Sequence, residues 1–175
     1  MAVVFGDFDL TDFWDNSEYA IGSYVGEPLT DELVASIEDE LGYKLPKSYI
    51  ELMKCQNGGT PQLTSHRTQE STSWAGDHIA ITGIYGINRS KLYSLGGDFG
   101  SQFWIDEWEY PPIGVYFCDC PSAGHDMICL DYRNCGSDGE PQVVHVDQEF
   151  DYNITFVADN FENFIRGLGS DEMFE

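Results

Sequence analysis

The sequence predicts an α+β fold: a single domain with a central, mostly antiparallel twisted sheet and helices at its N-terminal and C-terminal ends. Two observations predict this class. Helical patterns occur near residue 30 and near residue 160, and the apolar residues between them alternate as they do in strands. Helices and strands do not alternate along the chain, so a parallel sheet built from βαβ units is not favoured.

Residues 30–42 carry the start and stop signals of a helix. Thr30 is a good N-cap, and the next two residues, Asp31 and Glu32, place negative charge in the first turn, where the helix dipole stabilises it. Apolar side chains then recur at helical spacing up to Gly42, a residue type that commonly ends helices; they are Leu33, Val34, Ile37 and Leu41. We expect this helix to pack on the core through that face.

A second helix is predicted to start at Pro46, because proline is well tolerated at a first helical position. Tyr49, Leu52 and Met53 follow at i, i+3 and i+4. The sequence Asn-Gly-Gly at 57–59 should end the helix.

The middle of the chain predicts strands. Residues 60–76 are rich in Ser, Thr and Gln and should form a long loop. Alternating apolar residues then predict strands, the first with a possible bulge at Gly83, at residues 78–87, 113–120, 127–132 and 142–147.

The last predicted helix begins after Asp159. Asp159 is a suitable N-cap, and Glu162 stands three residues later, as in a capping box. The buried stripe of this helix should consist of Phe161, Phe164, Ile165 and Leu168.

The length of 175 residues is that of one domain. We expect residues 1–28 to form an acidic N-terminal extension packed on or flanking the domain of residues 29–175. No apolar run approaches the ~20 residues of a membrane span, and the first residues lack the basic region of a secretory signal. The sequence therefore predicts a cytoplasmic location.

Charge is the strongest compositional feature. The chain has 31 acidic and 8 basic residues and a formal net charge of −23, and residues 1–43 contain no Lys or Arg. A surface of this charge repels phosphate backbones and anionic lipids, so we expect no nucleic-acid partner and no membrane partner. It is either a solubilising surface or one complementary to a basic protein.

The five cysteines are expected to be reduced thiols, because their number is odd and a secretory signal is lacking. Cys118 and Cys120 lie near His125, Cys129 and Cys135, which raises the question of a zinc site. Structural zinc sites favour Cys pairs separated by two to four residues, whereas Cys118 and Cys120 are separated by one and should share a strand face. No metal ligands and no cofactor are predicted.

The acidic residues between positions 7 and 18 have the spacing of ligands in a calcium-binding loop. The candidate ligands would be Asp7, Asp9, Thr11, Asp15 and Glu18. The sixth position, which needs Gly for a sharp turn, is Asp12, and too few residues precede the loop for an entering helix. We expect a chance pattern in an acidic chain.

No catalytic residue is predicted, because the sequence contains none of the common hydrolase, metalloprotease or cysteine-nucleophile signatures. His125 and Asp126 should bridge a turn between strands, and His145 should be a structural histidine on a strand. The glycine-rich residues 96–100 carry no Lys and precede no helix-start pattern, so they predict a turn and not a phosphate-binding loop. We expect no small-molecule substrate.

The order of short motifs resembles that of the SUKH superfamily, which includes yeast Smi/Knr-type cell-wall assembly regulators and bacterial toxin-immunity proteins. The first motif is LG-x-x-LP-x-x-Y followed by NGG, at residues 41–59. Matching segments follow in the expected order at residues 111–115, 123–126, 130–132, 140–144 and 158–164. The motif residues should be architectural; they are Leu45, Pro46, Tyr49, Asn57, Gly58, Gly59, Leu130, Asp131 and Tyr132.

The resemblance implies a non-catalytic protein that binds another protein. The favoured expectation is a bacterial immunity protein that neutralises a cognate toxin domain, often a nuclease, whose basic surface would suit this acidic chain. The alternatives are a regulatory scaffold of the yeast cell-wall-signalling type or, with less support, a metal-binding protein or an enzyme.

Residues 104–110 are the most interface-like segment, because aromatic anchors stand beside acids that could form a negative rim. This segment also lies outside the recognisable family motifs. The predicted partner-binding residues are therefore Trp104, Asp106, Glu107, Trp108, Glu109 and Tyr110. The alternative is that both tryptophans belong to the core.

Overall fold

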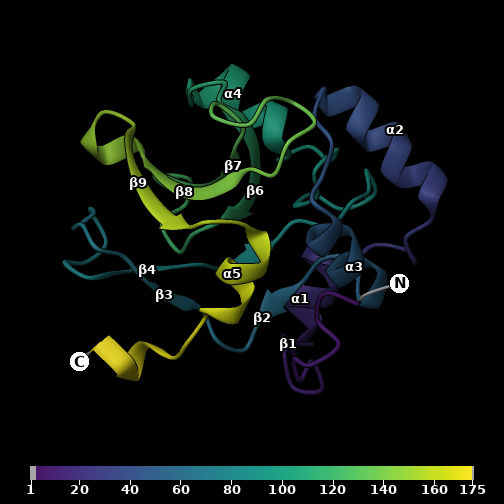
Figure 1. Ribbon diagram of the computed structural model, residues 1–175, viewed down its shortest axis with the longest axis horizontal. Coiled ribbons are helices and arrows are strands. Elements are labelled where there is room, and N and C mark those ends of the chain that lie inside the picture. The colour runs from purple at the N-terminus through teal and green to yellow at the C-terminus, as the bar shows by residue number, and fades with distance from the viewer. Residues whose placement is uncertain (1–2, 175) are drawn as a thin grey trace.

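The computed structural model describes residues 3–174 and confirms the α+β class. Five strands form the main antiparallel sheet, in the order β5-β6-β7-β8-β9 (Figure 1). Their bounds are Gly83–Ile84, Gly114–Asp119, Asp126–Asp131, Gln142–Asp147 and Asn153–Ala158. Two small antiparallel pairs flank it, one formed by β1 (Trp14–Asp15) and β2 (Thr60–Pro61), the other by β3 (Ser65–Arg67) and β4 (His78–Ala80).

The helices lie around this sheet. They are α1 (Glu18–Tyr24), α2 (Asp31–Leu41), α3 (Lys47–Cys55), α4 (Ser101–Trp108) and α5 (Phe161–Arg166), with short 3-10 turns at Gln148–Phe150 and Asp171–Phe174. In Figure 1, α1, α2 and α3 stand together on one side of the molecule, while α4 lies at another end of the sheet.

The predicted helical pair is confirmed, with boundaries within one residue. The Thr30 side chain accepts a hydrogen bond from the Leu33 N–H, and Gly42 has a left-handed φ of 81° at the end of α2. Pro46 is the N-cap of α3, one position before the first helical residue where we expected it. These ends are determined by residues next to them in the chain, which is why the sequence predicts them well.

Tyr116 and Phe117 point to opposite faces of the sheet, and the pairing of β6 with β7 shifts register between Tyr116 and Cys118. The Phe117 ring lies on the face covered by α3 and α5, 5.8 Å from the Tyr49 ring and 5.6 Å from the Phe164 ring. The Tyr116 ring lies 5.1 Å from Tyr110, just after α4. The main core is therefore under α3 and α5, and α4 covers the opposite face.

Asn57 joins three segments that are far apart in the sequence. Its buried amide nitrogen donates to the carbonyls of Glu27 and Ile87, at 3.0 and 3.1 Å, and its amide oxygen accepts from the Ile87 N–H at 2.7 Å. Gly58 follows with a φ of 99°, and a Cβ there would be 2.4 Å from the Tyr24 carbonyl oxygen. The Asn-Gly-Gly motif thus follows the end of α3 and also lets the backbone at Gly58 lie close to the backbone at Tyr24.

Val4 and Phe5, near the N-terminus, lie against α3 and α5. The Glu51 carboxylate accepts hydrogen bonds from the N–H groups of Val4 and Phe5, and Arg166 donates to the Val4 carbonyl. Phe5 is buried and Tyr24 has no exposed surface. The N-terminal segment therefore contributes side chains to the core.

Several predicted boundaries were wrong. Residues 78–87 form two strands, β4 and β5, in different sheets, and residues 60–76 contain β2 and β3 instead of a continuous loop. The sequence also did not predict α1 or β9. Tertiary pairing decides such short strands, so local alternation does not show where they break.

Two helix starts also differ from the prediction. Residues 96–100 form turns and bends, as predicted, but a helix follows them although no helix-start pattern was found: Gly100 is the N-cap of α4, without a capping side chain. The last helix is capped by Asn160, whose side chain accepts from the Asn163 N–H, and not by Asp159. Glu162 is therefore the second helical residue and not the third, which is the position that a capping box requires.

We expect Asn57→Ala to destabilise the fold by about 3 kcal/mol, because it leaves the Ile87 N–H and two carbonyls in the interior without their partner. Urea unfolding followed by circular dichroism would measure this. The matched control is Asn134→Ala at an exposed position, which should change stability by less than about 0.5 kcal/mol. Equal stability of the two variants would contradict the role given to Asn57.

Candidate interaction surface

Helix α4 contains most of the predicted partner-binding segment. Trp104 and Trp108 are spaced four residues apart in α4 and so lie on adjacent turns, while Phe99 precedes the helix and packs against Phe103. The helix ends at Glu109, which has a left-handed φ of 62°. The chain therefore reverses direction after α4, which places Tyr110 against Tyr116 of the sheet.

Buried anchors hold α4 in place. The Trp104 indole N–H lies 2.9 Å from the Phe99 carbonyl and 3.2 Å from the Tyr85 hydroxyl. The Tyr110 hydroxyl donates to the Gly124 carbonyl at 2.6 Å. Helix α4 is therefore fastened both to the loop before it and to the loop between β6 and β7.

The burial of these anchors sets them apart from the other predicted partner-binding residues. Trp104 and Tyr110 are only 6% and 1% exposed, so their main contacts are with the rest of the domain. Direct contact of either residue with a partner stays a prediction. Asp106, Glu107 and Glu109 are exposed and Trp108 is half-buried, so these four remain candidates.

An aromatic pocket lies beside α4, and the sequence analysis did not predict it. Its volume is about 240 Å³, and it is lined by Tyr93, Phe99, Phe103, Trp104, Trp108, Asp119, Ala123 and Gly124. The four-residue spacing of Phe99 and Phe103, and of Trp104 and Trp108, would have indicated an aromatic surface here. Asp119 reaches the pocket because of the register of β6, and no pattern in the neighbouring sequence predicts this position.

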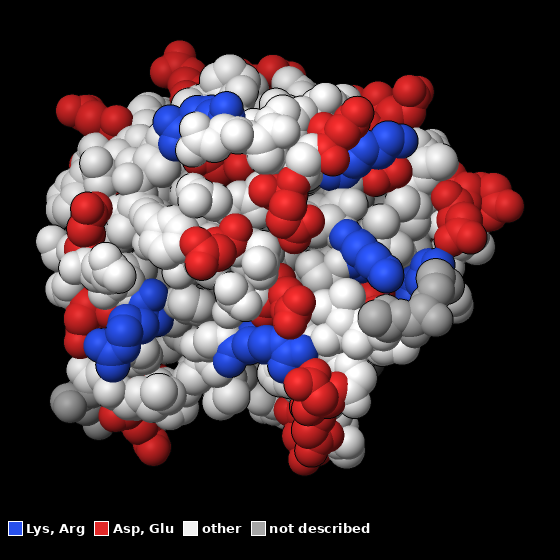
Figure 2. Space-filling view, in the orientation of Figure 1, with Lys and Arg blue, Asp and Glu red and all other residues white. Residues whose placement is uncertain are grey.

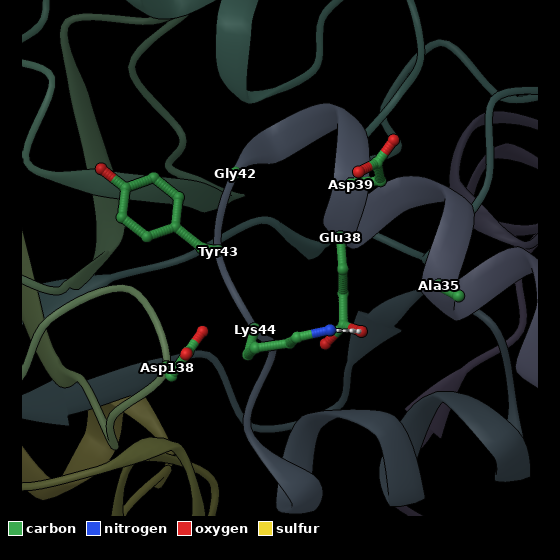
Figure 3. Close-up of a pocket in the computed structure, with 7 residues that line it drawn as sticks. All are labelled: Ala35, Glu38, Asp39, Gly42, Tyr43, Lys44 and Asp138. Carbon is green, nitrogen blue, oxygen red and sulfur yellow. Dashed lines mark ion pairs between the residues drawn. The ribbon is translucent and has the colours of Figure 1, made fainter.

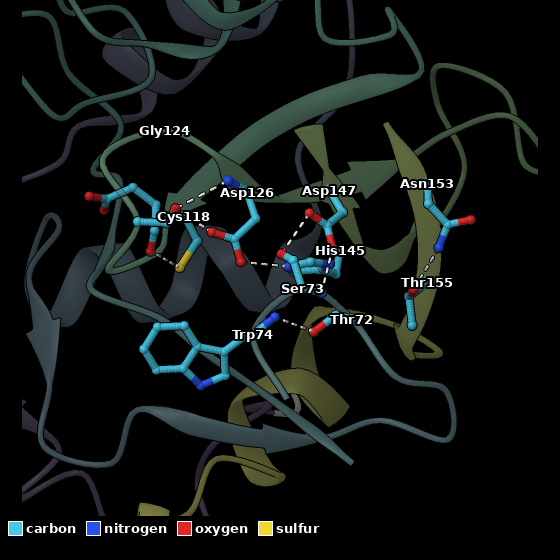
Figure 4. A network of polar contacts seen from close by, with 12 residues as sticks. Thr72, Ser73, Trp74, Cys118, Gly124, Asp126, His145, Asp147, Asn153 and Thr155 are labelled. Carbon is cyan, nitrogen blue, oxygen red and sulfur yellow. Dashed lines mark hydrogen bonds and ion pairs between the residues drawn. The ribbon is translucent and has the colours of Figure 1, made fainter. Parts of the chain in front are cut away.

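A buried polar network lies on the opposite face of the sheet (Figure 4). His145 Nε2 is 2.7 Å from Asp126 Oδ2, and the other oxygen of Asp126 accepts a hydrogen bond from the Ser122 hydroxyl. Ser122 Oγ also accepts from the Asp126 N–H. Asp126 thus bridges its turn, as predicted, and His145 is a buried strand residue.

The loop between β3 and β4 covers this network. Ser73 donates to Asp147 twice, from its N–H at 2.8 Å and from its hydroxyl at 2.7 Å (Figure 4). Asp147 is fully buried, so these bonds compensate for part of the cost of removing its carboxylate from water.

Cys120, Asp126 and His145 are the one group of close potential metal ligands among residues 3–174, with ligand atoms within 4.8 Å of one another. The 2.7 Å between His145 and Asp126 is a hydrogen-bond distance, whereas two ligands of one tetrahedral zinc lie roughly 3.3 Å or more apart. The geometry therefore favours a hydrogen-bonded network. Of the sequence candidates, only Cys120 belongs to this group, and His125 is exposed beside Glu149.

The three buried cysteines are not arranged for nucleophilic chemistry. Burial raises the pKa of the Cys118, Cys120 and Cys129 thiols well above the usual value, and neighbouring carboxylates add to the shift. A raised pKa disfavours the reactive thiolate. All five cysteines are free thiols, as the odd number led us to expect.

Two carboxylates of the acidic segment at residues 7–18 take part in other contacts. Asp7 is ion-paired with Arg166 at 2.8 Å, and Asp9 accepts a hydrogen bond from the Thr11 N–H. Asp15 lies in β1 and Glu18 begins α1. This arrangement does not favour the calcium alternative.

A second hollow, of about 260 Å³, lies at the end of α2 (Figure 3). It is polar, and its only cation, Lys44, is 3.8 Å from the Glu38 carboxylate. The Lys44 carbonyl accepts from the Tyr132 hydroxyl, so this loop is fastened to the sheet. We find no arrangement of these side chains that would perform chemistry.

Most basic side chains of the described residues are paired with acids. Ion pairs at 2.8 to 3.8 Å involve Lys44, Lys54, Arg89, Arg133 and Arg166. In the face seen in Figure 2, blue and red groups accordingly lie next to one another. Because the pairs cancel locally, the large excess of acids determines the net field of the surface.

The motif residues quoted from the sequence are buried, which supports an architectural role for them. Across these motifs, the family model SUKH_6, described as SMI1-KNR4 cell-wall, matches residues 31–165. The chain belongs to this family. The expected SUKH relationship is thereby confirmed, whereas comparison with curated proteins gave no match. Among residues 3–174 of this family member, no helix has the length and apolar character needed to cross a membrane.

The polar network should be a stabilising part of this family domain. We expect Asp126→Ala to cost about 3 kcal/mol, because it leaves His145 and Ser122 without their hydrogen-bond partner in the interior. Urea unfolding would measure the loss, with Asp138→Ala on the exposed turn as the control. A variant as stable as the control would show that the network is dispensable.

We also expect zinc to be unnecessary for folding. Protein purified in reducing buffer should contain clearly less than one equivalent of zinc by mass spectrometry, and its thermal unfolding should be unchanged by EDTA. One equivalent of tightly held zinc, lost together with stability in the Cys120→Ser variant, would instead identify the group around His145 as a metal site.

Proposed function

We propose that this chain is a non-catalytic immunity protein that binds a basic toxin domain in the cytoplasm and blocks it. The observation that carries the proposal is the net charge of −23 on a domain of the SMI1-KNR4 cell-wall family. A nuclease toxin must attract a phosphate backbone, so its active surface is basic and complementary to this chain.

The exposed acids of α4 support a role in this contact. Asp106, Glu107 and Glu109 are exposed on one short helix, beside the half-buried Trp108. Interfaces commonly combine a central aromatic anchor with a polar rim. None of the ion pairs of the described residues involves these three acids; the basic residues paired elsewhere are Lys44, Lys54, Arg89, Arg133 and Arg166.

The buried groups support a binding role more than an enzymatic one. Asp126 and His145 are 2% and 0% exposed, and their contact closes the space where a reacting atom would have to sit. The buried cysteines have raised pKa values and lack the features of activated nucleophiles.

The direct test is rescue of growth. The chain is coexpressed in a bacterium with the toxin domain encoded beside its gene, and survival is compared with that of cells that express the toxin alone. Protection together with formation of a stoichiometric complex supports the proposal. Growth arrest despite full expression of both proteins would refute it and favour the regulatory-scaffold alternative.

Electrostatic steering gives a quantitative expectation. Association with a catalytically inactive toxin should slow by about tenfold between 50 and 500 mM salt, because the screening length falls over this range. Neutralising α4 by Asp106→Asn, Glu107→Gln and Glu109→Gln should slow association several-fold with little change in dissociation. Stopped-flow fluorescence would measure both rates.

A matched control makes this expectation specific to α4. The triple variant Glu32→Gln, Asp39→Asn, Glu70→Gln removes the same charge from exposed positions on α2 and in the loop between β3 and β4. If both triple variants slow association equally, the association rate depends on net charge and not on α4 in particular. If neither variant slows association, α4 lies outside the interface.

A further inference from the structure

The aromatic pocket beside α4 is built from a continuous series of ring contacts. Ring centroids are 5.5 Å apart for Tyr93 and Phe99, 5.1 Å for Phe99 and Phe103, and 5.4 Å for Trp104 and Trp108. Tyr93, Phe99, Phe103 and Trp108 are half-buried, so part of each ring remains open to solvent. The pocket therefore presents aromatic surface that the protein's own core does not cover.

Asp119 is the one carboxylate among the residues that line this pocket. Its Oδ1 accepts hydrogen bonds from the Tyr24 hydroxyl at 2.7 Å and the Gly83 N–H at 3.2 Å. No Lys or Arg within residues 3–174 forms an ion pair with it. Burial raises the pKa of Asp119 to about 6, so at neutral pH it is a largely ionised carboxylate without a counter-ion.

This combination of groups is selective for an organic cation. Aromatic faces attract a cation through their quadrupole, and the attraction strengthens when the cation is partly removed from water. An ionised carboxylate in the same pocket adds a charge-assisted hydrogen bond. A neutral apolar guest would leave the Asp119 charge buried and unpaired, which is costly.

The dimensions of the pocket favour a single side chain. Its volume of about 240 Å³ is below the roughly 300–1,000 Å³ of pockets that bind small-molecule ligands. Among cationic side chains, arginine is planar and weakly hydrated, and it stacks on aromatic rings more readily than lysine does. The acids of the adjacent α4 would attract a basic protein surface towards the opening.

We propose that this pocket receives one arginine side chain of the basic partner protein, with the guanidinium stacked on the aromatic rings and paired with Asp119. The inference rests on the proposed function for the source of the arginine. It goes further by assigning an anchor site, which includes the half-buried Asp119 and the rings of Tyr93, Phe99, Phe103 and Trp108.

The pocket can be tested without any toxin. The ¹⁵N-labelled protein is titrated with the peptide acetyl-Gly-Arg-Gly-amide and, separately, with the same peptide carrying neutral citrulline in place of arginine. The arginine peptide should bind saturably in the millimolar range and shift the indole signals of Trp104 and Trp108. Those of Trp14 and Trp74 lie outside the pocket and should stay in place.

Two variants identify the contacts. Asp119→Asn keeps an oxygen that can accept from Tyr24 and Gly83, and Trp108→Ala removes one wall; each should weaken arginine binding by about tenfold or more. Trp74→Ala, at a position 45% exposed, is the matched control and should have no effect. The spectrum of each variant also verifies that it is folded.

The outcomes separate this inference from the proposed function. Absence of saturable binding, or equal binding of the citrulline peptide, overturns the pocket even if the chain still protects against its toxin. Conversely, one outcome is that the chain binds the arginine peptide selectively but fails to protect cells from the toxin. That result would support the pocket and refute the proposal that the arginine comes from a toxin. Both proposals are supported if Asp119→Asn lowers the affinity for the arginine peptide and also shortens the lifetime of the toxin complex.

Discussion

The fold depends on one buried amide. Asn57 binds the backbone at Glu27 and Ile87 from a position directly after α3, so three segments from different parts of the sequence meet at one side chain. The Gly26 N–H completes the junction by donating to the Asn57 carbonyl at 2.9 Å. Through this junction, the N-terminal segment, the helical pair and the edge of the main sheet take fixed positions relative to one another.

How far the sequence predicts the structure depends on how local the determining contacts are. Thr30 and Gly42 act on their own helix, and their roles were predicted correctly. Gly100 begins α4 without a capping side chain, so that helix had no start signal. Residues 78–87 alternate as one strand, but β4 pairs with β3 while β5 pairs with β6, and this division is decided by residues distant in the chain.

The candidate site shows the same limit. Composition placed Trp108 and three neighbouring acids in an interface-like segment, and the structure leaves them accessible. It could not show that Trp104 and Tyr110 are anchors, because their partners Tyr85, Phe99 and Gly124 come from other loops. Asp119 reaches the aromatic pocket only because β6 changes register after Tyr116, an event that the alternation of residues 113–120 does not reveal.

That change of register has a consequence for how the domain can diversify. Asp119 and Cys120 are neighbours in sequence, yet one lines the open pocket and the other lies with Asp126 and His145 in the sealed interior. Substitutions at half-buried ring positions of the pocket, such as Phe103 and Trp108, can therefore accumulate without touching the Asp126–His145 contact. The two faces of the sheet can change at different rates, so new binding preferences can be acquired while the buried polar network stays the same.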